Sequence, residues 1–466
     1  MSTRNRHKSL MLALLISIFI TKNCADSDNK TECLSETEHS FMNFASKTPY
    51  YHAHGNISEE VSALQSNGCD VHSMWMMVRH GSRYPERVEG SFIRHHLSQI
   101  KRKLVHAHLH GSGSLCKKDI ELLKEWDAEK LPHNRRMQLL ETGRVEMKKL
   151  GARMREALPQ FFNESILNHN ISVWSTKTDR TKETAKVFLE GFSPLQNLEK
   201  TIVVKERDRI MQFHEICHKY NEKVFHGSHI PAFMKFLKGP KIQSVVDSVS
   251  KRIAVTVESL HVVLMYNACR YYKVMEPLKH SAWCAVFSRK DMEVMEFGED
   301  LFLHHDHGYA FDITYEQACP VVQDILQRFR YQNDSSVFYF THLEAVIKVI
   351  TRFGFFNDSK PLTWETMDSR RRWRTSDFGG FGSNIAFLLT KCKEVGWTVN
   401  TYINEKRAHL PKCARTKGCP WLLFKKLYGK YEVCPFDELC GNKGFGSNWF
   451  SGPRQFWRNL NLFREL

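Results

Sequence analysis

The chain has 466 residues, 42% of them hydrophobic, and a formal net charge of +16. At roughly 150 residues per domain, this length predicts two or three domains. The sequence contains no internal repeat and no low-complexity linker. After the N-terminal segment there is no run of about 18 apolar residues, so the composition argues against a repeat architecture and against a transmembrane helix.

The first 25 residues have the pattern of a secretory signal. Basic residues precede an apolar segment, Leu10 to Ile20, which is too short to span a bilayer, and Ala25 offers a cleavage site. We therefore expect residues 1–25 to be a signal peptide and the mature chain to be secreted or lumenal. The tail 463–466 ends like an endoplasmic-reticulum retention signal but lacks its Lys-Asp start, which leaves both destinations open.

Cysteines and glycosylation sequences fit the same compartment. Loss of Cys24 with the signal reduces the 13 cysteines to 12, an even number that favours disulfides. Short spacings suggest local disulfides, Cys413–Cys419 and Cys434–Cys440. Asn-X-Ser/Thr sequences begin at Asn29, Asn56, Asn163, Asn170, Asn333 and Asn357.

The charge of the mature chain favours an anionic partner. Residues 1–25 carry four basic and no acidic side chains, so the rest of the chain keeps +12. Charge alone does not separate a polyphosphate substrate from a glycosaminoglycan or from a generally basic surface. The secretory location argues against nucleic acid.

Three segments share one pattern, a short β-rich run followed by polar residues and then a helical period. The runs are Met74–Val78, Ile171–Trp174 and Val337–Phe340. Strands that alternate with helices are typical of an α/β fold. We therefore expect a mostly parallel sheet that is flanked by helices.

The stretch 206–306 has few strand signals and several amphipathic helical patterns, around Pro231–Leu237, Val245–Val263 and Asp291–Phe297. We expect a smaller α-helical domain inserted here, between core parts at 26–205 and 307–466. The second core part, which ends in a cysteine-rich segment, contains a predicted helix at Asp312–Arg330, a turn at Gly379–Gly382 and an apolar helix at Ile385–Leu389.

The first of the three strands leads into Arg79-His80-Gly81-Ser82-Arg83-Tyr84-Pro85. Two guanidinium groups four positions apart can grip one phosphate through bidentate hydrogen bonds, and a neutral imidazole between them can attack phosphorus. Gly81 lets the backbone come close to an anion. Because α/β folds bind ligands at the carboxyl ends of strands, this loop predicts a phosphate site.

The other two strands deliver complementary groups. Arg180 lies in the first helical turn after its strand, where the helix dipole favours an anion. His342 and Glu344 follow the third strand, and a carboxylic acid there can protonate a leaving alkoxide and then activate water. Taken alone, Arg180 could also be an ordinary first-turn residue that faces water. Similarly, Thr341 could cap the helix, with Glu344 in the first turn only because the helix dipole favours an acidic residue there.

Together, the heptapeptide, Arg180 and His342-Leu343-Glu344 resemble the histidine acid phosphatases, and within them the multiple inositol-polyphosphate phosphatases, which carry RHGTRYP and His-Ala-Glu at these places. The likeness extends from about Cys69 to Cys440. It includes the segments Gly143–Met147, Leu150–Arg153, Gln323–Gln327, Phe355–Leu362, Arg372–Arg374 and Cys434–Phe436.

The resemblance implies a phosphoglycerate-mutase-like core, a phosphohistidine intermediate, and no metal or organic cofactor. It implies that His80 is the nucleophile and that Glu344 is the proton donor. The residues that it implies for binding the phosphoryl oxygens are Arg79, Arg83, Arg180 and His342.

Three positions depart from the family pattern, and the first is Ser82, where the family has Thr. Leu343 replaces the family's Ala and can narrow which ring positions are accepted, and Thr341 stands where close relatives have Gly. Further cations can meet the additional phosphates of a polyphosphorylated ring, although charge runs usually face water. These are Lys177, Lys182, Arg370, Arg371, Arg372 and Arg374.

Two other segments carry metal-ligand residues. His214–His218 matches the zinc motif H-E-x-x-H, but Asn221 and Val224 stand where a metzincin continuation needs Gly and His, and Cys217 also fits a disulfide. His304–His307 is a histidine cluster, which we interpret as a polar loop. We expect neither segment to hold a metal.

The sequence thus predicts a phosphomonoesterase with a small, polyphosphorylated substrate such as inositol hexakisphosphate. The family resemblance also permits hydrolysis of 2,3-bisphosphoglycerate. Two alternatives stay open, a broad-specificity acid phosphatase and a secreted protein that has kept the pocket but captures anions without catalysis. Neither the oligomeric state nor the order of attack on ring positions follows from the sequence.

Overall fold

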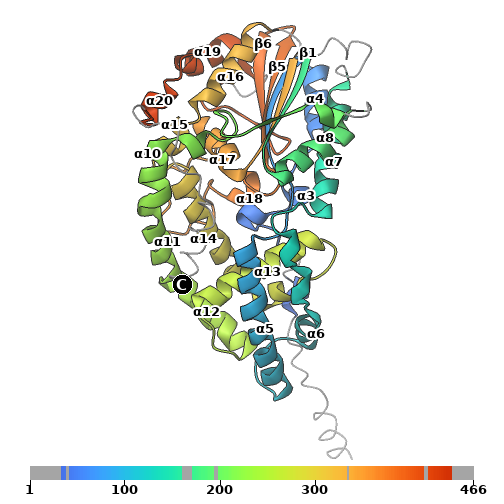
Figure 1. Ribbon diagram of the computed structural model, residues 1–466, viewed down its shortest axis with the longest axis vertical. Coiled ribbons are helices and arrows are strands. Elements are labelled where there is room, and N and C mark those ends of the chain that lie inside the picture. Colours follow the sequence, from blue (N-terminus) through green and yellow to red (C-terminus); the bar gives the residue numbers. More distant parts are fainter. Residues whose placement is uncertain are drawn as a thin grey trace, which may run out of the picture.

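The computed structural model describes residues 33–37, 41–159, 170–193, 198–332, 335–413 and 418–442. A central sheet with helices on both faces forms one half of the molecule, and helices alone form the other half (Figure 1). The expected signal peptide, the tail 463–466 and the acceptor sequences at Asn29, Asn163 and Asn333 lie outside the described residues.

The sheet has the strand order β3-β2-β4-β1-β5-β6-β7, and β8 pairs with β6. β3, β2, β4 and β1 are paired in parallel, whereas every pairing beyond β1 is antiparallel. The α/β class is confirmed, but the sheet is mixed. The strands are β1 (Cys69–Arg79), β2 (Asn170–Thr176), β3 (Ile202–Lys205), β4 (Ser335–Thr341), β5 (Asn384–Cys392), β6 (Gly396–Ile403), β7 (Lys406–Ala408) and β8 (Cys419–Pro420).

The predicted helix at Ile385–Leu389 is wrong, because these residues belong to β5. Ile385 and Phe387 pack into one hydrophobic cluster, whereas Ala386 and Leu388 pack into the other. A strand that is covered on both faces is apolar throughout, so its pattern does not distinguish it from a buried helix. Gly396, with a positive φ of 71°, begins β6 after a tight turn.

Helices cover both faces of the sheet. Met74 and Met76 of β1 pack toward α4, α7 and α8, whereas Trp75 and Met77 pack toward α16, α17 and α19. Trp75 also donates its indole N–H to Asp324 of α16, at 2.7 Å. The bounds are α4 (Ile57–Ser66), α7 (Glu141–Ala157), α8 (Asp179–Phe192), α16 (Cys319–Arg330), α17 (Leu343–Arg352) and α19 (Trp421–Tyr428).

The stretch 206–306 is helical, as expected, and its described residues contain no strand. Two earlier helices, α5 (Arg87–Leu109) and α6 (Lys117–Glu125), also pack in this half (Figure 1). Its other main helices are α11 (His229–Leu237), α12 (Pro240–Ile253), α13 (Ser259–Met275) and α14 (Arg289–His307). The helical half therefore comes from two stretches of chain, and the domain boundaries at 206 and 306 stay a prediction.

Three sequence-based assignments need smaller corrections. The pattern Val245–Val263 covers the end of α12 and the start of α13, not one helix. The pattern Asp312–Arg330 contains α15 (Asp312–Glu316) and α16, and Pro320 stands in the first turn of α16, where its missing N–H has no cost. The cluster His304–His307 forms the last turn of α14 and is not a loop.

Short segments complete the fold. They are α2 (Leu34–Thr37), α3 (Tyr50–Ala53), α9 (Phe213–Ile216), α10 (His218–Tyr220), α18 (Thr375–Phe378), α20 (Phe436–Leu439), the 3-10 turns η1 (Ala45–Lys47), η2 (Ala128–Lys130), η3 (His133–Arg135), η6 (Leu198–Thr201), η8 (Ala282–Val286) and η9 (Gly429–Tyr431), and the π-helical turn η7 (Asn221–Ser228).

Four of the six disulfides among the described residues join segments that lie more than 80 residues apart. Cys413–Cys419 is confirmed, but the predicted Cys434–Cys440 bond is wrong, because Cys434 pairs with Cys319 and Cys440 pairs with Cys217. Short spacing in the sequence did not predict these two bonds, because each cysteine pairs with a partner that comes near it only in the folded chain. The remaining bonds are Cys33–Cys116, Cys69–Cys392 and Cys269–Cys284.

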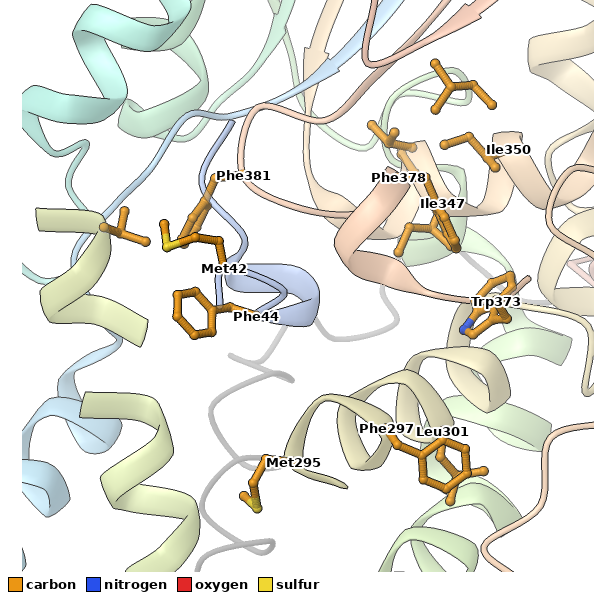
Figure 2. Packing of buried hydrophobic residues seen from close by; sticks show 14 of the residues in the cluster. Met42, Phe44, Met295, Phe297, Leu301, Ile347, Ile350, Trp373, Phe378 and Phe381 are labelled. Carbon is orange, nitrogen blue, oxygen red and sulfur yellow. The ribbon is translucent and has the colours of Figure 1, made fainter. Parts of the chain in front are cut away.

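The larger hydrophobic cluster runs from the sheet into the helical half without a break. Figure 2 shows Phe44 and Phe381 near one another, Phe297 and Leu301 on α14, and Ile347 on α17. Because residues from both halves pack in one core, the sheet and the helices support each other along their shared boundary.

Close contact between α7 and α8 makes a testable prediction. A Cβ on Gly191 would lie 1.9 Å from the Lys148 carbonyl oxygen, a backbone atom that moves only if the helices separate. We expect Gly191→Ala to lower the free energy of unfolding by roughly 1–3 kcal/mol in denaturant titration. A Cβ on Gly429 meets no atom within 4 Å, so Gly429→Ala is the matched control. Equal stability of the two variants would contradict this helix packing.

Candidate active site

The carboxyl ends of three neighbouring parallel strands meet at one edge of the sheet. Arg79 at the end of β1 is in register with Thr341 at the end of β4, and β2 pairs with the other side of β4. The residues that follow these strands therefore leave from the same edge. This register brings together the three segments that the sequence analysis selected.

His80 is buried, with 3% of its surface exposed. Its Nδ1 lies 3.0 Å from the carbonyl oxygen of Gly81. Because a carbonyl only accepts, Nδ1 carries the proton and Nε2 keeps its lone pair. Burial, and then the positive charge of Arg180, holds the pKa of His80 well below its ordinary value. The imidazole is therefore neutral and can act as a nucleophile at Nε2.

Three guanidinium groups gather around His80. Arg180, Arg79 and Arg83 each lower its pKa by their charge, and each has a buried Nε–H with no hydrogen-bond partner among the described residues. A buried donor without an acceptor is costly, so native structures rarely leave one unpaired. Three such donors on the arginines around one histidine are available to the acceptor oxygens of a phosphate.

Each guanidinium is anchored at another nitrogen. Arg79 donates from Nη1 to the carbonyl oxygens of Ser46, at 2.5 Å, and Gly379, at 2.7 Å. Arg83 donates from Nη1 to its neighbour Tyr84, at 2.8 Å. These bonds fix the arginine side chains and leave the Nε groups unpaired, which is the preorganisation that an anion site needs.

The arginines also repel one another. Burial, and then the charge of Arg83, lowers the pKa of Arg79 to about 9 and that of Arg180 to about 10. The aromatic ring of Phe381 partly offsets this repulsion, because it lies 4.6 Å from the guanidinium carbon of Arg79 and 6.0 Å from that of Arg83. A bound anion would relieve the remaining repulsion.

His342 links β2 to the clamp. Its Nε2 lies 3.1 Å from the hydroxyl of Thr176, and its Nδ1 accepts from Nη2 of Arg180 at 3.3 Å. Burial lowers the pKa of His342 well below its ordinary value, as does the charge of Arg180. His342 is therefore a neutral ring that orients Arg180 from the N-cap position of α17, and its contact with the phosphoryl oxygens stays a prediction.

Glu344 lies in the first turn of α17 and is partly exposed. Its charge opposes the lowering of pKa at both Arg79 and Arg180, so the carboxylate is near enough to the clamp to act on both guanidinium groups. Thr341, the alternative helix cap, instead donates its hydroxyl to the carbonyl of Met211 at 2.7 Å. Leu343 is partly buried against the core, and its effect on the choice of ring position stays a prediction.

The additional cations have partners in the protein. Lys177 pairs with Glu206 at 3.0 Å and Lys182 with Asp179 at 2.9 Å, on largely exposed surface. Their contact with substrate stays a prediction. Arg370, whose side chain is 90% exposed, lies 3.7 Å from Asp368.

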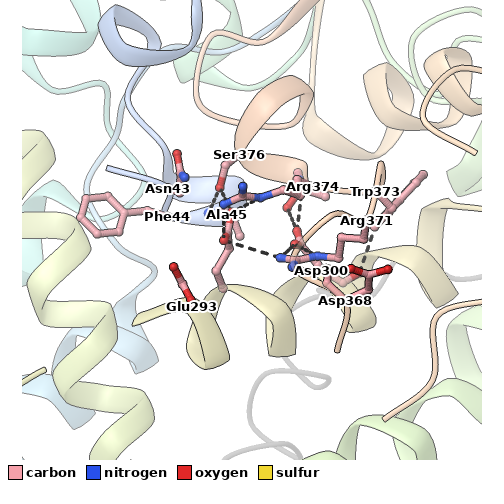
Figure 3. A network of polar contacts seen from close by, with 12 residues as sticks. Asn43, Phe44, Ala45, Glu293, Asp300, Asp368, Arg371, Trp373, Arg374 and Ser376 are labelled. Atoms are coloured by element: carbon pink, nitrogen blue, oxygen red, sulfur yellow. Dashed lines mark hydrogen bonds and ion pairs between the residues drawn. The ribbon is translucent and has the colours of Figure 1, made fainter. Parts of the chain in front are cut away.

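The rest of the arginine run contacts carboxylates and carbonyls. Arg371 binds Asp300 of α14 at 2.6 Å and Arg374 binds Glu296 of α14 at 2.8 Å, whereas Arg372 donates to the carbonyl of Asn357. Figure 3 shows Arg371 and Arg374 in this network. The contacts give the run an internal role in fixing α14 to α18, so a role in substrate binding stays a prediction.

Glu146 of α7 supports the nucleophile loop, a role that the sequence analysis did not assign. It accepts from the hydroxyl of Ser82 at 2.9 Å and from the amide of Tyr51 at 3.1 Å. Nearby, a Cβ on Gly143 would lie 2.3 Å from the Ser82 carbonyl oxygen, so α7 touches the loop directly. Glu146 lies in the segment Gly143–Met147, which belongs to the family likeness, and that likeness was the sequence signal that pointed to it.

The zinc-like motif has a structural role. Cys217 separates α9 from α10 and is bonded to Cys440, and burial lowers the pKa of His214 to about 3. In the described part of the chain, the one cluster with metal-ligand spacing is Cys33, Cys116 and Asp119. Its two cysteines form a disulfide, so their thiolates are not available to a metal.

Comparison with known proteins identifies the family. The model of the histidine phosphatase superfamily (branch 2) matches residues 70–406, and the chain belongs to this family. Multiple inositol polyphosphate phosphatase 1 from Drosophila melanogaster is 24% identical to it over 85% of this chain and 86% of that protein. The predicted family is thus confirmed.

Solved structures confirm the fold. The phytase from D. castellii has a TM-score of 0.65 at 14% identity and covers 82% of this chain and 86% of its own. The Bifidobacterium longum multiple inositol polyphosphate phosphatase, in complex with inositol hexasulfate, has a TM-score of 0.64 at 13% identity, and the match covers 86% of this chain and 100% of that one. No described helix is long and apolar enough to cross a membrane.

The raised pKa of Glu146 predicts that the stability of the fold depends on pH. Burial raises its pKa from 4.5 to about 7, so the folded chain holds this proton more tightly than the unfolded chain does. The stability that this carboxyl contributes is therefore present below pH 4.5 and is lost as the pH rises toward 7. Glu146→Gln keeps an acceptor for Ser82 but does not titrate. Over this pH range the variant should therefore lose less stability than wild type, and the difference should be at most roughly 3 kcal/mol. Thermal unfolding between these pH values measures the difference, and parallel curves for variant and wild type would contradict it.

Proposed function

We propose that this chain is a phosphomonoesterase that hydrolyses inositol polyphosphates through a phosphohistidine at His80. The observation that carries the proposal is the group of three buried, unpaired Nε–H donors around a neutral imidazole. Phosphoryl transfer needs positioning and charge stabilisation more than covalent chemistry, and this cluster supplies both.

The reaction has two steps. In the first, Nε2 of His80 attacks phosphorus, the bond from phosphorus to the ester oxygen breaks, and Glu344 gives its proton to the leaving alkoxide. In the second, Glu344 takes a proton from water, whose oxygen attacks phosphorus and releases His80 and inorganic phosphate. Arg79, Arg83 and Arg180 hold the phosphoryl oxygens throughout.

The environment of His80 also sets the conditions for activity. Since its pKa is well below the ordinary value, the nucleophile keeps its lone pair in mildly acidic solution, where a free histidine becomes protonated. Among the described residues, six disulfides fit an oxidising compartment. We therefore propose a secreted or lumenal enzyme that works below neutral pH.

Relatives support the choice of substrate. The Drosophila relative is named for inositol polyphosphates, and the Bifidobacterium longum neighbour is in complex with inositol hexasulfate. The formal charge of +16 is compatible with a polyanionic small molecule. We propose inositol hexakisphosphate and its lower phosphates as substrates, with 2,3-bisphosphoglycerate as a second one.

Removal of the nucleophile tests the mechanism. His80→Ala should lower phosphate release from inositol hexakisphosphate at least about 1000-fold, because the covalent route is lost. Circular dichroism and the melting temperature should stay close to those of wild type. Substantial activity in a folded variant would rule out His80 as the nucleophile.

Removal of the acid tests the role of Glu344. Glu344→Gln should slow the hydrolysis of inositol hexakisphosphate, whose alkoxide needs a proton, by roughly 100-fold or more. The first step with p-nitrophenyl phosphate should change far less, because its leaving group departs without a proton. Rapid-mixing release of nitrophenol measures that step, and equal losses with both substrates would argue against a proton donor.

Comparison of the same two substrates in the wild type separates the proposal from its alternatives. An inositol polyphosphate phosphatase should have the higher kcat/KM with inositol hexakisphosphate. A broad-specificity acid phosphatase would favour the aryl ester, and an anion-binding protein would release phosphate from neither.

A further inference from the structure

The turn η1 carries Lys47 to the edge of the arginine clamp. On one side of it, the carbonyl of Ser46 accepts the hydrogen bond from Arg79 at 2.5 Å. On the other side, the carbonyl of Thr48 accepts from the amide of Phe381 at 2.9 Å. Both neighbours of Lys47 are therefore bonded to groups of the site itself, which fixes the position of its backbone.

The Lys47 side chain is mostly buried, next to charged and aromatic groups. Only 15% of it is exposed, and Nζ lies 5.5 Å from the centre of the Tyr271 ring. The amine is 3.9 Å from a carboxylate oxygen of Glu89, too far for a hydrogen bond, and it makes no hydrogen bond within the described part of the chain. The backbone of Lys47 is therefore fixed, and the N–H donors of its amine have no hydrogen-bond acceptor among the described residues.

The charges around Lys47 do not neutralise it fully. Burial, and then the charge of Arg270, lowers the pKa of its amine, and the charge of Arg83 adds to this effect. Two carboxylates oppose the shift, but Glu299 is already bonded to Arg270, and Glu89 already accepts from the Tyr271 hydroxyl at 2.8 Å. Arg83 belongs to the clamp, so the positive potential extends from the clamp to Lys47.

We propose that Lys47 binds a second phosphate of the substrate, next to the one that is transferred at His80. The inference rests on the proposed function, because it assumes a substrate with several phosphates. An inositol polyphosphate carries phosphates on adjacent ring carbons, so one group in the clamp places another beside it. A lysine binds phosphate as a point charge, and the added anion stabilises its protonated form. Lys47 thus distinguishes polyphosphorylated substrates from simple esters.

Substitution by methionine tests this role, since it keeps an unbranched apolar side chain and removes the charge. Lys47→Met should lower kcat/KM for inositol hexakisphosphate about 10-fold, mainly through KM, and should leave p-nitrophenyl phosphate within about 2-fold of wild type. Lys47→Arg should recover most of the loss. Lys118→Met is the matched control, because Lys118 lies on the remote helix α6, is half-exposed and pairs with Glu36 of α2. It should change neither substrate.

A binding measurement separates this inference from the proposed function. Calorimetry with inositol hexasulfate, which does not turn over, should give a Kd about 10-fold weaker for Lys47→Met than for wild type, whereas the Kd of inorganic phosphate should not change. Unchanged hexasulfate binding, or an equal loss for both ligands, would overturn the role of Lys47 even if the wild type hydrolyses inositol hexakisphosphate. A wild type that binds hexasulfate but releases no phosphate would instead overturn the proposed function.

Discussion

The structure depends on holding three positive guanidinium groups around one neutral histidine. Arg79, Arg83 and Arg180 repel one another, and burial removes the water that would screen them. The charge of Glu344 opposes the lowering of the pKa of Arg79 and of Arg180 but does not cancel it. The fold must therefore supply the energy that keeps these charges together.

Much of that support comes from backbone atoms. Carbonyl oxygens of Ser46 and Gly379 anchor the guanidinium of Arg79. The pairing of β1 with β4 fixes the backbone position of Arg79. The segments that carry these carbonyls are tied to the helical half, since the amide of Ala45 donates to Ser376 at 2.9 Å, and Ser376 donates to Glu296 of α14 at 2.6 Å. Figure 3 shows Ala45 and Ser376 beside α14. The buried carboxylates of α14 thus act on the site through two intermediate segments.

The sequence could predict what is local or follows from strand order. His80, Arg79 and Arg83 share one heptapeptide, and Arg180 and His342 follow strands whose ends must meet in a parallel sheet. It could not predict β5, whose apolar residues face two helical layers, nor the partners of Cys434 and Cys440, which lie in other parts of the chain.

Other site features were hidden for a similar reason. Lys47 and Glu146 act through contacts with segments far along the chain, and the family likeness at Gly143–Met147 was the one sequence signal for Glu146. Conversely, the run from Arg370 to Arg374 resembled a substrate-facing patch, but Arg371 and Arg374 pair with the carboxylates of α14. A charge run does not reveal its partners, because they come from another element.

The central claim is that His80 becomes phosphorylated during turnover. The most direct measurement is to mix the enzyme with p-nitrophenyl phosphate, quench it in base within milliseconds, and map the phosphate by mass spectrometry of the peptides. Phosphohistidine survives base and hydrolyses in acid. The account predicts an acid-labile phosphate on the peptide that contains His80, and none in His80→Ala. Turnover without a phosphorylated peptide, or with phosphate on another residue, would contradict it.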